Sequence, residues 1–134
     1  MKKILCYLGL LLITISLCSC GGNAKNAETH EVPSNLYSQE EISAAINTIK
    51  NEFQSNWKGC ALKEIYYAGD DVTSGYQEWA DRNNADEVIV LLSSFDVDAS
   101  GGDGSLNPNS TYTGWNWILV RKDKGAWKHV DHGY

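Results

Sequence analysis

The stretch YSQEEISAAINTIKNEFQ, residues 37–54, decides the fold. Ser38 followed by Glu41 three residues later is the pattern of a helix-starting capping box, and Tyr37 with Ile42 fits a hydrophobic staple. The apolar residues that follow recur at helical spacing and form one stripe: Ile42, Ala45, Ile46, Ile49 and Phe53. The sequence therefore predicts a long amphipathic helix that buries one face against another element.

The rest of residues 37–134 has the composition of strands separated by one short helix. Residues 60–67 are rich in residues that favour strands, and residues 72–83 have Tyr76 and Trp79 at helical spacing. Residues 87–95 contain a continuous apolar run, which suits a strand covered on both faces. Residues 115–121 and 126–131 flank a turn and predict a hairpin. We therefore expect a single α+β domain with an antiparallel sheet of about four strands.

This order of elements over residues 37–134, together with the ending Ala126-Trp127-Lys128-His129-Val130-Asp131, resembles the NTF2-like or cystatin-like superfamily, notably its small exported lipoprotein domains. The resemblance implies a curved sheet wrapped on the long helix, with a cone-shaped cavity between them. Because that fold serves enzymes, ligand binders and assembly modules alike, it does not determine a function.

The first residues have the pattern of an export signal: Lys2 and Lys3 precede an apolar run over residues 4–17. That run is too short for a membrane-spanning helix of about 20 residues. Its ending, Leu17-Cys18-Ser19-Cys20, resembles the lipobox of bacterial lipoproteins. The resemblance implies that residues 1–19 are a removed signal peptide, that Cys20 carries lipid, and that the protein is anchored on the extracytoplasmic face of the cell membrane.

Residues 20–36 contain almost no large apolar side chain, which predicts a flexible tether between the lipid on Cys20 and the domain. Without residues 1–19 the chain has nine Lys and Arg against seventeen Asp and Glu. Such an acidic chain is a poor partner for nucleic acid. We also expect it to contact the membrane through its lipid alone. With Cys20 lipidated, Cys60 has no disulfide partner, and we expect it to be buried.

The acidic loop after residue 95 begins like an EF-hand loop, with oxygen ligands at Asp96, Asp98 and Ser100 and a glycine at the sixth position. Asn107 then stands where a bidentate Glu is required, and no helix follows. With Asp103 these residues form a candidate for a weak calcium site. The alternative is a plain loop that joins two strands, and we expect no other cofactor.

The histidines near the C-terminus are a second candidate site. In a regular strand His129 and Asp131 share one face and form a candidate acid/base pair, whereas His132 points the opposite way unless a bulge intervenes. Asp96 or Glu64 are candidate carboxylates for the same small envelope enzyme. The alternative is that these are ordinary strand residues.

Aromatic residues provide a third candidate, because Trp115 and Trp117 fall on one strand face with Trp127 across from them and Tyr112 nearby. Such residues line glycan and peptide sites, and they also form cross-strand core pairs. If the tryptophan face of residues 115–120 packs against the helix, these rings are core; if the opposite face does, they form a ligand-binding surface.

Together these observations favour a lipid-anchored, non-enzymatic envelope domain that binds a peptide, a glycan fragment or a protein partner. A small hydrolase-like enzyme that uses His129 and Asp131, and a calcium-stabilised adhesion module, are the alternatives.

Overall fold

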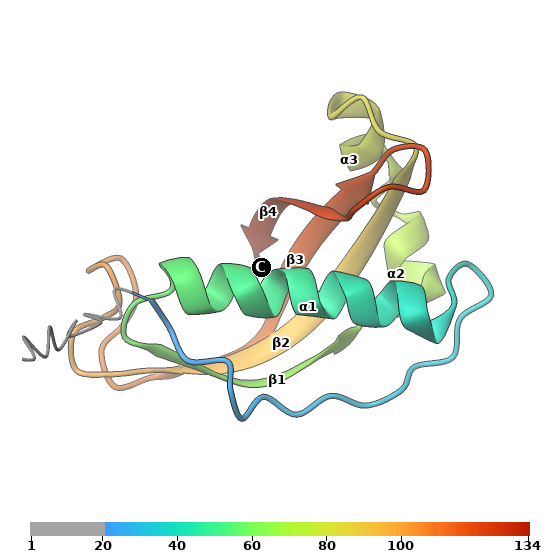
Figure 1. Ribbon diagram of the computed structural model, residues 1–134. Coiled ribbons are helices and arrows are strands. Elements are labelled where there is room, and N and C mark those ends of the chain that lie inside the picture. Colours follow the sequence, from blue (N-terminus) through green and yellow to red (C-terminus); the bar gives the residue numbers. More distant parts are fainter. Residues whose placement is uncertain (1–20) are drawn as a thin grey trace, which may run out of the picture.

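A computed structural model describes residues 21–134, so the signal peptide and the lipidated Cys20 expected from the sequence lie outside the described residues. Within that part the chain is an α+β protein with three helices and one sheet of four antiparallel strands (Figure 1). The elements in chain order are α1 (Gln39–Asn56), β1 (Cys60–Tyr67), α2 (Asp70–Ser74), α3 (Gln77–Arg82), β2 (Glu87–Val97), β3 (Thr111–Arg121) and β4 (Lys128–Gly133).

The sheet is a meander in which each strand pairs with its neighbours in sequence, in the order β1-β2-β3-β4. Helix α1 crosses one face of the sheet and α3 packs on the other, while Thr73 of the short helix α2 accepts a hydrogen bond from the backbone N–H of Val90 in β2 (3.3 Å) (Figure 1). The α+β class and the four antiparallel strands are thus as predicted. The expected single helix over residues 72–83 is instead two short helices, because the chain turns at Gly75 and Tyr76 between them.

Helix α1 begins as its sequence dictates. Ser38 Oγ accepts a hydrogen bond from the backbone N–H of Glu41 (3.1 Å), and the Glu41 carboxylate accepts one from the N–H of Ser38 (3.0 Å). This confirms the predicted capping box, which satisfies two of the N–H groups that a helix start leaves free. The buried residues of α1 are the five of the predicted stripe.

Strand β2 is covered on both faces, which explains its continuous apolar run. Ile89 and Leu91 belong to the main core under α1, whereas Val88 packs in a smaller cluster on the opposite face. Ala80 of α3 is fully buried in that smaller cluster, against β2 and β3.

A buried arginine joins the start of α1 to the sheet. Arg121 at the end of β3 is only 6% exposed and forms ion pairs with Glu41 of α1 and Glu87 of β2. Its guanidinium lies 4.3 Å from the ring centre of Trp127 and 5.5 Å from that of Tyr37. The hydrogen bond from the Ser38 backbone and the Arg121 guanidinium hold the pKa of Glu41 down at about 2.

Residues 21–36 do not stand free of the domain as the expected tether would. The N–H of Gly22 donates to the carbonyl of Phe53 (3.1 Å), and Asn23 and Glu28 form parallel bridges with β1. Ala24 is buried in the main core. Composition alone missed this because β1 is a sheet edge, whose unpaired N–H and C=O groups bind a passing chain whatever its side chains are.

Replacing Arg121 with Met should lower the free energy of unfolding by about 2 kcal/mol, because the partly exposed carboxylate of Glu41 loses its cation and that of Glu87 keeps only Lys124 (2.8 Å). Arg82→Met is the matched control: Arg82 is exposed and pairs with Glu78 at the surface, so the loss should stay below about 1 kcal/mol. Urea denaturation measures both. Equal losses in the two variants would contradict the anchoring role of Arg121.

Candidate functional site

The tryptophan face of the hairpin is turned toward α1, and most of it is core. Trp117 is fully buried and its indole N–H donates to Ser93 Oγ (2.7 Å). Trp127 is 6% exposed and donates to the carbonyl of Glu41 (3.0 Å). Trp115 lies farther along the sheet and is only partly buried, so of the three it is the one available to a ligand.

Two β-bulges bring further rings to this same face. One extra residue in β3, beside Gly114, shifts the register between Ser93 and Phe95, so that Tyr112 stacks on Phe95. One extra residue in β4 shifts the register between Ile118 and Leu119, so that His129 and His132 both face α1. A regular strand would have placed His129 and His132 on opposite faces, and the bulge in β4 places them on the same face. His129 Nε2 lies 3.2 Å from His132 Nδ1.

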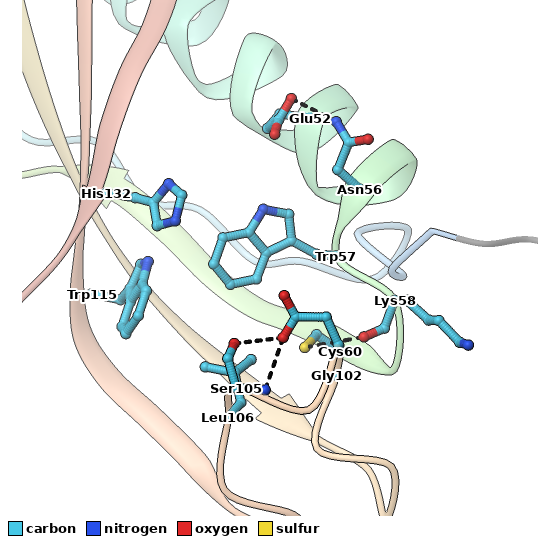
Figure 2. A pocket seen from close by; sticks show the side chains of 11 residues that line it. Glu52, Asn56, Trp57, Lys58, Cys60, Gly102, Ser105, Leu106, Trp115 and His132 are labelled. Carbon is cyan, nitrogen blue, oxygen red and sulfur yellow. Dashed lines mark hydrogen bonds between the residues drawn. The ribbon is translucent and has the colours of Figure 1, made fainter.

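A cavity of about 300 Å³ lies at the C-terminal end of α1 (Figure 2). Three parts of the fold meet there: the end of α1, the loop between β2 and β3, and the adjoining ends of β3 and β4. The lining residues are Glu52, Asn56, Trp57, Lys58, Cys60, Gly102, Asp103, Ser105, Leu106, Trp115 and His132. We call this hollow the helix-end pocket. Its volume is at the lower end of the range for small-molecule sites.

The walls of the helix-end pocket are mainly rings. Trp57 stacks on Phe53 of α1 (centres 5.5 Å apart, planes 7° apart), which fixes its orientation. Trp115 stands almost perpendicular to it at 5.9 Å, and His132 lies 5.0 Å from Trp57 and 5.9 Å from Trp115. Figure 2 shows the three rings turned toward the same hollow. These rings form a rigid aromatic wall against which a ligand can pack.

The loop of residues 98–110 forms the other side of the pocket and is held by hydrogen bonds. The N–H of Leu106 donates to the carbonyl of Gly101 (3.2 Å), and that of Asn107 donates to the hydroxyl of Tyr112 (3.1 Å). Gly102 has a φ of 70°, and a Cβ there would lie 3.2 Å from Leu106 Cδ1, so the loop needs glycine at this point.

The calcium candidates do not converge. Asp98 and Asp103 each cap their own turn, accepting hydrogen bonds from Ser100 and Ser105 respectively. Asp96 lies on the other face of the sheet, where it accepts from Thr111 (2.7 Å) and approaches Lys63 (3.7 Å). Across residues 21–134 no group of three or more His, Cys, Asp or Glu side chains is placed to hold a metal ion.

The expectation that His129 and Asp131 share a face is wrong, because the β4 bulge places Asp131 opposite Ile118, whose side chain belongs to the far face of the sheet. Glu64 is bonded to Ser94 instead, away from both histidines. His129 packs against Trp117 and lies 4.0 Å from Glu52. Burial and the neighbouring His132 lower the pKa of His129.

The lone thiol is buried, as expected. Cys60 is 5% exposed at the base of the helix-end pocket, and desolvation, helped by the negative charges of Asp98 and Asp103, raises its pKa to about 11. A thiol with such a pKa is protonated at neutral pH and is a poor nucleophile.

Sequence reasoning found Trp115 but missed Trp57, Glu52 and Leu106 as pocket residues. Trp57 carried a signal, since a large aromatic residue directly after an amphipathic helix continues its apolar stripe. No sequence pattern marks Glu52 or Leu106 as pocket residues, because only the packing of the loop against the end of α1 brings them together.

The chain was compared with protein-family models, with curated proteins and with solved structures, and none of them matches it. None of the helices within residues 21–134 has the length and apolar character that crossing a membrane requires.

The stability of the protein should fall between pH 7.5 and pH 5.5, and His129 should account for part of the fall. Its pKa is lower in the folded chain than in the unfolded chain, so the unfolded state binds the proton more readily as the pH drops below about 6.5. His129→Gln should therefore flatten the dependence of the unfolding free energy on pH, as measured by urea denaturation. Equal slopes in the two proteins would contradict this.

Proposed function

We propose that the chain is a lipid-anchored protein of the cell envelope, and that its domain binds a ligand in the helix-end pocket without catalysing a reaction. The proposal rests on the partly open hollow whose wall is formed by the mutually packed rings of Trp57, Trp115 and His132. Ligand-binding sites are typically preformed and concave, and aromatic side chains with a polar atom commonly line them.

We assign the domain to the NTF2-like or cystatin-like architecture. One helix across one face of a four-stranded antiparallel meander supports the assignment. So does a cavity between the end of α1 and the sheet, where the resemblance places one.

The anchor in this proposal is the lipid on Cys20, at the extracytoplasmic face of the membrane. Gly22 is hydrogen-bonded to Phe53 near the C-terminal end of α1, and Asn23 is bonded to the carbonyl of Cys60 (2.9 Å). A lipid attached directly before Gly21 would thus hold the pocket end of the domain close to the bilayer instead of on a long spacer.

Two features support binding without catalysis. The Cys60 thiol is buried with a pKa of about 11, and His129 and Asp131 point to opposite faces of the sheet. Turnover of a hydrolysable substrate that disappears in His129→Gln would contradict this part of the proposal.

The anchor is tested by growing cells with an alkyne-bearing fatty acid and detecting label on the protein. Wild type should be labelled and Cys20→Ser should lose the label. Cys18→Ser should keep it, since Cys18 leaves with the signal peptide. Label that persists in Cys20→Ser would contradict lipidation at this residue.

The site is tested with a panel of short peptides, glycan fragments and small metabolites, screened by the shift of melting temperature that a ligand of the folded state produces. At least one class should raise the melting temperature of wild type and of Trp79→Leu, but not of Trp115→Leu. Trp79 is the matched control because it lies on the opposite face of the sheet. A ligand whose effect is the same in Trp115→Leu would place binding elsewhere.

A further inference from the structure

The helix-end pocket has two acidic side chains on different elements and no basic partner for either. Glu52 comes from α1 and Asp103 from the loop between β2 and β3. Within residues 21–134 neither carboxylate is paired with Lys or Arg, and the ring of His129, 4.0 Å from Glu52, has a lowered pKa that disfavours its charged form. The pocket therefore has uncompensated negative charge.

Hydrogen bonds keep these carboxylates in place. Asn56 donates to Glu52 Oε2 (3.0 Å), and the N–H of Ser105 donates to Asp103 Oδ1 (2.9 Å), where the Ser105 hydroxyl also donates. The hydrogen bonds from Ser105 lower the pKa of Asp103, so this side chain stays ionised at neutral pH.

The basic residue at the rim does not neutralise the pocket. Lys58 belongs to the lining, but Figure 2 shows its side chain extending away from the ring of Trp57. Its positive charge acts on Asp98 instead, whose pKa it helps to lower. A ligand with a positive charge would therefore complement the pocket.

We propose that the helix-end pocket binds the cationic head of a small organic amine, held against the wall that the rings of Trp57 and Trp115 form and attracted by the carboxylates of Glu52 and Asp103. The inference rests on the proposed binding function and names its ligand class. An ammonium group is attracted to the face of a tryptophan as well as to carboxylates, and the attraction grows when the cation is partly removed from water.

Other ligand classes fit the same walls less well. An anion would be repelled by both carboxylates, with no cation turned toward it from the lining. A neutral sugar would stack on the rings but would leave the two negative charges uncompensated. The cavity volume of about 300 Å³ limits the ligand to a small molecule. The net charge of the chain, −6, favours the approach of a cation.

The test compares choline with 3,3-dimethylbutan-1-ol, a neutral molecule of the same shape, by tryptophan fluorescence at low ionic strength. Choline should bind at least about tenfold more tightly than the neutral alcohol, because only choline has the charge. Glu52→Gln and Asp103→Asn should each weaken choline binding about threefold or more. Glu78→Gln, an exposed acid on α3, should leave it unchanged.

Removing an aromatic wall should have a larger effect. Trp115→Leu should abolish choline binding, whereas Trp79→Leu should keep it, and the melting temperature of each variant checks that the domain is folded. Equal affinity for choline and the neutral alcohol would overturn the ammonium assignment while leaving ligand binding intact.

Three further outcomes distinguish a failure of this inference from a failure of the proposed function. A peptide or glycan that binds with the same dependence on Trp115, when no small amine binds, would overturn the ligand class alone. Binding to phosphatidylcholine vesicles without binding to choline would overturn the assignment to a free small amine. Absence of any ligand that depends on Trp115 would overturn both the inference and the binding site.

Discussion

A single buried cation joins the start of the long helix to the sheet. The Arg121 guanidinium is enclosed by the rings of Trp127 and Tyr37 and joined to Glu41 and Glu87, so it connects the first turn of α1 with the ends of β2 and β3. Taking such a charge out of water is costly unless every partner is present. Because Glu41 also completes the capping box of α1, the start of the helix and its position on the sheet are fixed by the same contact.

The pocket is a consequence of where that anchor lies. With its first turn fixed at one end of the sheet, α1 places its last residues and Trp57 at the opposite end, where the β2–β3 loop packs (Figure 1). There the bulges in β3 and β4 turn Tyr112 and His132 to the helix side, so that rings line a hollow instead of filling it. The core and the site thus belong to one continuous aromatic layer, in which Trp117 is wholly buried and Trp115 only partly.

The features that the sequence predicts well are those set by local pattern. The capping box and the stripe of α1 follow from helical spacing, and the doubly covered strand β2 follows from its continuous apolar run; both elements lie where these patterns predict them. The site depends on departures from periodicity: one extra residue in β4 reverses the face of Asp131 and pairs His129 with His132. No local pattern marks that residue, Val130. The edge pairing of residues 21–28 escaped prediction for a related reason, because it is made by backbone groups that composition does not describe.

In our proposal, the exposed end of this aromatic layer is a cation-binding pocket. It is tested most directly by the indole N–H signals of the five tryptophans in a ¹⁵N–¹H spectrum during a titration with tetramethylammonium. The signals of Trp57 and Trp115 should move together along one saturable curve, while those of Trp79, Trp117 and Trp127 stay in place. Uniform small shifts of all five signals, or a saturable shift confined to Trp79, would contradict it.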